Sequence, residues 1–156
     1  MSYQIYVAGP FADRPNVREQ AEKLRAAGYN VVARWLTLDV EEGPNSAGSL
    51  EALNMEEHQE FLREQAMNDI EDLLNADLMF IVNSRKSEGK AVELGVAIAT
   101  LKPVIMVGQR TNVFQTLNIP RFDTTEGAIE WMKEQEAIFN DAQAKALEGV
   151  EARVVG

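Results

Sequence analysis

The feature that most constrains the fold of this sequence is a strand–turn–helix–strand pattern in residues 78–107. Residues 78–82 (LMFIV) form a continuous apolar run, which is typical of a strand buried on both faces. A polar turn at residues 84–89 follows, and then a helical pattern at residues 90–101 and a second apolar run at residues 103–107. This is the βαβ pattern of a parallel sheet, and the rest of the chain is expected to extend that sheet.

Strand and helix patterns alternate along the remaining sequence. The predicted strands occupy residues 3–8, 30–36, 78–82, 103–107 and 121–123. The predicted helices occupy residues 15–27, 57–76, 90–101, 124–132 and 134–148, the last capped by Gly149. The apolar stripe of the 57–76 helix consists of Phe61, Ala66, Ile70, Leu73 and Leu74.

This alternation predicts an α/β protein, a three-layer α/β/α arrangement around about five parallel strands. The 156 residues are expected to form a single domain. Residues 36–56 are acidic and rich in Gly, Ser and Asn, and they predict a long loop that is either a lid or a mobile insertion. The tail from residue 150 is expected to be an extra strand or disordered.

Composition excludes several classes of site. The chain has no cysteine, so a thiol nucleophile, a disulfide and a Cys-type zinc site are excluded. Its one histidine, His58, lies among glutamates and is expected at the surface, and we expect no metal and no cofactor. The net charge of −10 argues against nucleic-acid or anionic-membrane partners. No membrane-spanning run or signal peptide is indicated, so the expected location is cytoplasmic.

In a parallel sheet, ligands bind beyond the carboxyl ends of the strands. The loops expected there are GPFADRP, residues 36–56, NSRKSEG and GQRTN, and they hold most of the concentrated polar chemistry. No G-x-G-x-x-G follows the first strand, and no P-loop or G-x-S-x-G motif occurs, so dinucleotide, P-loop and serine-hydrolase sites lose their main support.

Glu93 is the most conspicuous polar residue of the central helix, because Val92, Leu94, Val96, Ala97 and Ile98 surround it. A carboxylate there either reaches the polar end of the sheet or is desolvated, and both situations suit a reactive group. The alternative is that Glu93 lies on a solvated stripe with Lys86, Lys90 and Thr100. Composition alone leaves both interpretations open.

Three segments together resemble the nucleoside 2-deoxyribosyltransferase family and its relatives that hydrolyse 2′-deoxynucleoside 5′-monophosphates. They are IYVAGPF, NDIEDLLNADLMFIV and SEGKAVELGVAIATLKPVIMVG, and the resemblance covers roughly residues 3–132. It implies a flavodoxin-like fold, a homodimer or larger homo-oligomer, and a small-molecule deoxynucleoside or deoxynucleotide substrate.

The resemblance also implies roles for three residues. Glu93 matches the glutamate nucleophile, which would stabilise an oxocarbenium-like state and form a glycosyl-enzyme ester. Asp69 matches an acidic residue near the substrate and would assist departure of the base; its alternative is a solvated helix position. Tyr6 matches a tyrosine that orients the nucleophile; its alternative is a strand aromatic packed under a helix. Asp77 is expected to be a turn or cap residue.

The resemblance places Ser87 where transferases of free nucleosides have Asp and the monophosphate hydrolases have Ser. A serine and backbone N–H groups at a helix N-terminus can bind phosphate, whereas simple helix capping is the alternative. Glu88 departs from this phosphate-binding pattern. The other predicted substrate-binding residues are Gly9, Phe11, Arg14, Gly89 and Asn112, and further basic or aromatic candidates are Arg18, Trp35, Arg85, Lys86 and Lys90.

Three functions therefore remain open at this point. The first is cleavage of the N-glycosidic bond of deoxynucleoside monophosphates. The second is base exchange between free deoxynucleosides, and the third is binding or sensing of nucleotides without turnover.

Overall fold

The computed structural model describes residues 3–38 and 53–155, and at its centre is a sheet of five parallel strands in the order β2-β1-β3-β4-β5. The strands are β1 Gln4–Ala8, β2 Asn30–Val31, β3 Leu78–Asn83, β4 Val104–Gly108 and β5 Arg121–Phe122. This order is that of the flavodoxin-like doubly wound sheet. It confirms the predicted fold class.

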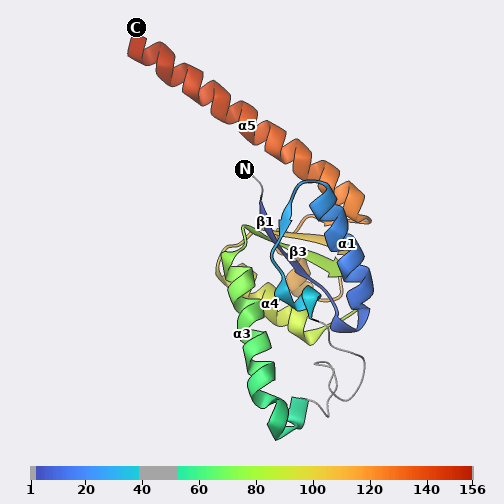
Figure 1. Cartoon of the computed structure of the whole chain (residues 1–156). Coiled ribbons are helices and arrows are strands. Elements are labelled where there is room, and N and C mark those ends of the chain that lie inside the picture. Colours follow the sequence, from blue (N-terminus) through green and yellow to red (C-terminus); the bar gives the residue numbers. More distant parts are fainter. Residues whose placement is uncertain (1–2, 39–52, 156) are drawn as a thin grey trace.

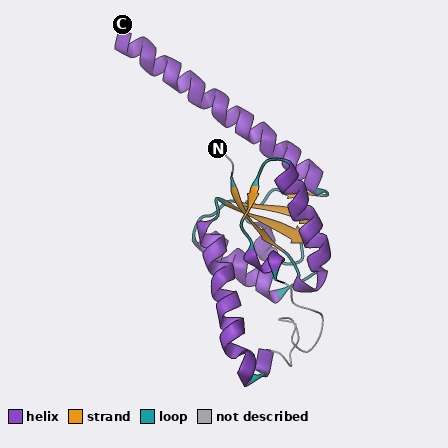
Figure 2. Ribbon diagram, viewed as in Figure 1, coloured by secondary structure: helices purple, strands orange, loops and turns teal. Residues whose placement is uncertain are grey.

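Four long helices flank the sheet: α1 Arg14–Ala26, α3 Gln59–Asn75, α4 Glu88–Ala99 and α5 Thr125–Val155. Helices α1 and α5 contact each other, as do α3 and α4. In Figures 1 and 2, α1 and α3 lie on opposite sides of the sheet, which gives the three layers. Every residue of β3 is buried, as its continuous apolar run predicts.

The second strand is shorter than predicted, because the chain leaves the sheet after Val31 and forms a 3₁₀ helix at Arg34–Thr37. Asp72 on α3 accepts hydrogen bonds from the backbone N–H and the Nε of Arg34, each at 2.8 Å. The indole N–H of Trp35 donates to the Val7 carbonyl at 2.9 Å. These side-chain bonds to α3 and β1 hold residues 34–37 away from the sheet edge.

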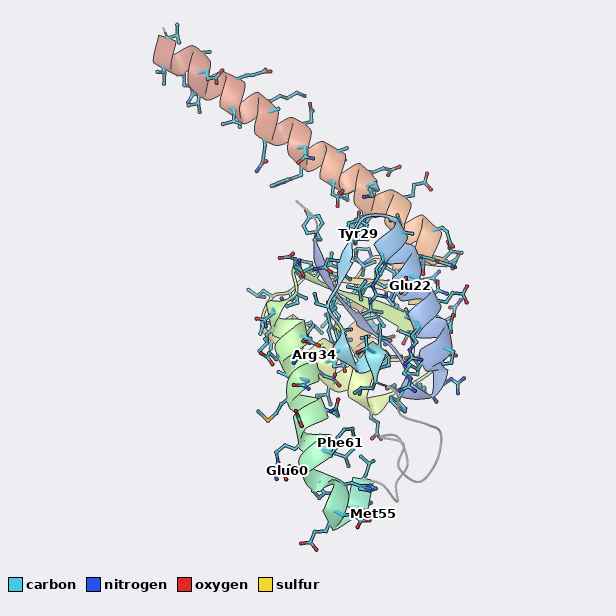
Figure 3. The ribbon with its side chains drawn as sticks, in the orientation of Figure 1. Glu22, Tyr29, Arg34, Met55, Glu60 and Phe61 are labelled. Carbon is cyan, nitrogen blue, oxygen red and sulfur yellow. The ribbon has the colours of Figure 1, made fainter. Side chains whose placement is uncertain are left out.

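Of the predicted core stripe of α3, only Leu73 is fully buried. Phe61 is 43% exposed and Leu74 is 49% exposed. The N-terminal half of α3 runs past the sheet, and Phe61 lies on this part, far from the strands (Figure 3). The helical periodicity is as predicted, but none of the described residues forms a layer opposite this half.

The C-terminal region is a single helix, whereas two helices and a strand-like or disordered tail were predicted. Helix α5 continues from Thr125 to Val155, and Gly149 lies inside it. A glycine inside a helix costs about 1 kcal/mol relative to alanine, and the good helix formers around Gly149 outweigh this cost.

The predicted 36–56 loop is described only at its two ends. Residues 39–52, on which the lid prediction rests, lie outside the described residues, and Glu56–His58 form a 3₁₀ helix before α3.

Candidate active site

The candidate site lies where the sheet order changes direction, between β1 and β3. The chain continues from β1 to β2 on one side, whereas β3 leads to β4 on the other, and such switch points are where doubly wound sheets bind ligands. Two loops meet there, and Ser84 after β3 donates a short hydrogen bond to Asp13 after β1. The same carboxylate lies 3.9 Å from the guanidinium of Arg85.

A tyrosine–glutamate pair forms the centre of the site. Tyr6 on β1 is fully buried, and its hydroxyl donates to Oε1 of Glu93 at 3.1 Å. Glu93 is half-buried on the side of α4 that faces the sheet, the side that also carries buried Lys90, Leu94 and Ala97. In the alternative interpretation, Glu93 shares a solvated stripe with Lys90. Lys90 is only 3% exposed, so these two residues do not form a solvated stripe.

The protonation states of this pair follow from burial. Burial raises the pKa of Glu93 to about 8, and the charge of Asp69 adds to the rise, against the hydrogen bond from Tyr6 and the charge of Lys90. Burial, together with the charges of Glu93 and Asp69, raises the pKa of Tyr6 far above its usual range. Tyr6 therefore remains a neutral phenol that donates a hydrogen bond to the carboxyl group of Glu93.

Asp69 supplies a second carboxyl group from α3. Burial and the neighbouring charge of Asp72 raise its pKa to about 6, against the opposing charge of Arg34. Asp72 itself is held by its hydrogen bonds to Arg34, which lies beside α3 in Figure 3. Two electrostatically coupled carboxyl groups with pKa values near 6 and 8 can share acid and base roles close to neutral pH.

The turn before α4 is ordered by its own side chains. Ser87 is the N-cap of α4, and its Oγ accepts from the backbone N–H of Lys90 at 3.4 Å. The Nζ of Lys90 donates to the Arg85 carbonyl at 2.6 Å, and burial lowers the pKa of Lys90 to about 8. The buried Lys90 side chain therefore stabilises the turn through this hydrogen bond, whereas the side chains of Arg85 and Lys86 are exposed.

The segment from the end of β1 to the first residue of α1 contains three of the predicted substrate-binding residues. A Cβ at Gly9 would lie 2.5 Å from Val17, so only glycine permits this close approach of the loop to α1. Phe11 is half-buried and packs on the core, and the guanidinium of Arg14 lies 4.8 Å from the centre of its ring. This loop lies across the switch point from the Ser84–Ser87 turn.

The remaining candidates have other local partners. Gly89 is exposed in the first turn of α4. Asn112 accepts backbone hydrogen bonds at the start of the 3₁₀ helix Val113–Thr116 and lies beside the outer face of α4. Arg18 donates to the carbonyls of Leu36 and Leu38, and Trp35 is 7% exposed.

Asp77, predicted to be a turn or cap residue, accepts a hydrogen bond from the Gln4 backbone at 2.7 Å. This bond ties the start of β1 to the residue before β3, so Asp77 serves the structure as predicted.

Sequence reasoning missed Asp13, Asp72 and Asn83. Asp13 stands at the N-cap position of α1, but its side chain does not cap the helix and instead binds Ser84 and Asn16. These hydrogen bonds, together with Arg85, lower the pKa of Asp13. Asn83 is 3% exposed at the end of β3, and its amide donates to Gln115 at 3.1 Å, which holds the loop after β4. The Asp-Arg-Pro sequence at the start of α1 was the only local signal for any of the three.

The described residues contain neither a metal-binding cluster nor a membrane-spanning helix. In residues 3–38 and 53–155, no cluster of three or more His, Asp and Glu side chains is placed to hold a metal ion. None of the helices in the same ranges has the length and apolarity that crossing a bilayer requires.

A flavodoxin-like sheet with a hydrogen-bonded glutamate at its switch point defines an α/β protein with a carboxylate-based site. The nucleoside 2-deoxyribosyltransferase family model matches residues 5–147, and the chain belongs to this family. A search of curated protein sequences finds no match.

Solved structures agree with this family assignment. A 2-deoxyribosyltransferase from the psychrotolerant bacterium Bacillus psychrosaccharolyticus has a TM-score of 0.55 and 25% identity, over 81% of this chain and 90% of that one. A conserved protein from Enterococcus faecalis V583 has a TM-score of 0.61 and 18% identity, over 86% and 99% of the two chains, and it shows the fold alone.

Proposed function

We propose that the protein cleaves the N-glycosidic bond of 2′-deoxynucleoside 5′-monophosphates with Glu93 as the nucleophile. The observation that carries this proposal is the hydrogen bond between Tyr6 and Glu93, next to the carboxyl group of Asp69. Tyr6 fixes one carboxylate oxygen, which leaves the other oxygen of Glu93 to attack C1′. The family supports deoxyribosyl chemistry in general, and the choice of nucleophile and of a monophosphate substrate belongs to this proposal.

The proposed reaction has two balanced steps. In the first, a Glu93 oxygen bonds to C1′ as the C1′–N bond breaks, and Asp69 gives its proton to the departing base. In the second, water attacks C1′, Asp69 accepts the proton of that water, and the ester bond to Glu93 breaks. The products are the free base and 2-deoxyribose 5-phosphate. A second base in place of water would give deoxyribosyl transfer.

The phosphate preference rests on the turn before α4. Ser87 brings no charge to the helix N-terminus, and backbone N–H groups there favour an anion. The exposed Arg85 stands in the same turn, held near Asp13, and adds a positive charge. The carboxylate of Glu88 in the first turn of α4 opposes phosphate binding, so the alternative of base exchange on free deoxynucleosides keeps one specific observation in its favour.

A substrate panel tests the proposal directly. The full chain is incubated with deoxynucleoside monophosphates and with the matching deoxynucleosides, each with and without a second free base. We expect base release from the monophosphates. New nucleosides that form only with an added base would favour the transferase alternative, and binding without any product would favour a nucleotide-binding protein.

Ser87→Asp is expected to erase the preference for monophosphates. It places a negative charge where the phosphate would bind, and a lost charge-assisted contact costs about 1.5–3 kcal/mol, or roughly 10- to 150-fold in kcat/KM. The deoxynucleoside reaction should change much less. Both substrates are measured by kcat/KM in the wild-type and variant proteins.

Thr124→Asp is the matched control, because Thr124 Oγ1 accepts from the Gly127 backbone at 3.1 Å at the start of α5. Asp caps a helix about as well as Ser or Thr does, so stability should be nearly unchanged in both variants. An unchanged substrate ratio in Ser87→Asp would show that Ser87 is only a cap.

Asp13→Asn is expected to raise KM for monophosphates about 10-fold with little change in kcat, because Arg85 loses its ion-pair partner and the link to Ser84 weakens. KM for free deoxynucleosides should stay the same. Asp123→Asn is the control, since Asp123 makes a comparable pair with Arg121 at 2.9 Å. A fall in kcat on both substrates would instead indicate that Asp13 positions the catalytic groups.

A further inference from the structure

The C-terminal part of α5 extends beyond the rest of the fold. Thr125, Ala128 and Met132 in its first turns are buried, but every described residue from 137 to 155 is exposed. Figure 1 shows this part of the helix running away from the sheet as a straight rod. At about 1.5 Å per residue it is roughly 28 Å long.

The exposed rod has an apolar stripe, which continues the face that is buried in the first turns. From Met132 the stripe proceeds in helical steps through Phe139, Ala142, Ala146, Val150 and Val154. Phe139 is 57% exposed and Val154 is 80% exposed. Most charged residues of the same stretch lie on the other half of the helix, namely Asp141, Lys145, Glu148 and Glu151, whereas Arg153 falls within the stripe. Such a stripe is typical of a helix that packs against another surface.

An apolar groove of about 400 Å³ lies at the base of this rod. It is formed by the N-terminal ends of the strands and the adjoining turns of α5, so it is at the opposite edge of the sheet from the candidate active site. Its lining includes Tyr3, Leu78, Pro103, Pro120, Trp131 and Phe139. The rod is one straight helix, so its own tip cannot fold back into this groove.

We propose that α5 pairs antiparallel with α5 of a second copy of this chain, so that the tip of each helix lies against the base groove of the other. In this arrangement Phe139 faces Val154 of the second copy, Ala142 faces its Val150, and Ala146 lies near the two-fold axis. Large side chains thus meet small ones, and alanine at the centre permits close approach of the helices. The same surface serves both copies, as a two-fold interface requires.

Charge favours a second copy over a lipid surface. Between residues 133 and 155 the helix carries the acids Glu134, Glu136, Asp141, Glu148 and Glu151 and the bases Lys133, Lys145 and Arg153. Helices that lie on membranes are rich in Lys and Arg on the polar face, whereas here the acids are in excess. The net charge of −10 would add repulsion from anionic lipids.

Sedimentation of the full chain tests the surface. We expect a dimer, and Val150→Asp should raise its dissociation constant at least about 10-fold, because it buries a charge in the interface. Ala144→Asp adds the same charge on the opposite half of the helix and should leave the dimer intact. A monomeric wild-type chain, or equal dissociation constants in the two variants, would overturn the proposal. So would wild-type binding to phosphatidylglycerol vesicles that Val150→Asp abolishes.

Cross-linking tests the antiparallel direction, and the absence of cysteine from the chain makes each introduced thiol unique. Gln135→Cys combined with Val154→Cys should give a covalent dimer with a short bis-maleimide. Val154→Cys alone should not, because the two thiols would lie about 22 Å apart. Cross-linking by Val154→Cys alone would mean that the helices run parallel, and the proposal would fail.

Discussion

Glu93→Gln is expected to lower turnover at least about 10⁴-fold and, at pH 8, to raise the melting temperature of the protein. Removal of a nucleophile removes the covalent route, and single losses in such catalytic sets commonly cost this much. Gln keeps the size of the side chain and an oxygen that can accept from the Tyr6 hydroxyl. The expected loss is therefore one of chemistry and not of folding.

The gain in stability follows from the pKa of Glu93. In the folded protein this pKa is raised to about 8 from an ordinary value of 4.5. A group with a raised folded pKa contributes stability fully below its unfolded pKa, and this contribution is lost as pH rises through the folded pKa. Ionised Glu93 thus destabilises the wild type near pH 8, and Gln avoids the cost. We expect roughly 1–3 kcal/mol of difference in unfolding free energy at pH 8 and almost none at pH 4.5.

Two measurements on the same samples test this prediction: thermal unfolding at pH 4.5 and pH 8, and the rate of base release. Glu130→Gln is the control, because Glu130 is exposed on α5, outside the candidate site, and its replacement should change neither quantity appreciably. A folded Glu93→Gln protein that releases base at a near-wild-type rate would falsify the assignment of the nucleophile.

Local patterns were sufficient for most of the sheet and for the central helix. The apolar run of β3 is readable from sequence because a strand buried on both faces needs no alternation. The C-terminal end of β2 could not be predicted from the sequence. It is set by Asp72 and Val7, which accept hydrogen bonds from Arg34 and Trp35 across the fold. Such contacts join residues far apart in sequence, and no local propensity contains them.

The site was predictable to a similar degree. The sequence left open whether Glu93 faces solvent, and only the position of α4 over the sheet decides that its side chain reaches Tyr6. Asp13 was missed because its partner Ser84 is 71 residues away in the chain. The exposed half of α3 shows the converse error, since its helical period is correct but the layer that would cover it is absent from the described residues.

Asp69→Asn is expected to lower the rate of base release by about 10²–10⁴-fold, the usual range for loss of a general acid. The physical reason is that burial raises the pKa of Asp69 to about 6, so a fraction of the enzyme near neutral pH holds the proton that the departing base needs. The loss should be smaller for bases that leave easily, because they need less protonation. Glu71→Gln, an exposed neighbour that pairs with Arg34, is the control.

The pH profile separates acid catalysis from simple positioning by Asp69. If ionised Glu93 and protonated Asp69 are both needed, wild-type kcat/KM should rise to about pH 6, stay level, and decline above about pH 8. Asn has no proton to lose, so the decline above pH 8 should disappear in the variant. The rise should also reach its plateau at a pH below 8, because the charge of Asp69 no longer raises the pKa of Glu93. A variant that keeps the alkaline decline and loses equal activity on every base would show that Asp69 only positions the substrate.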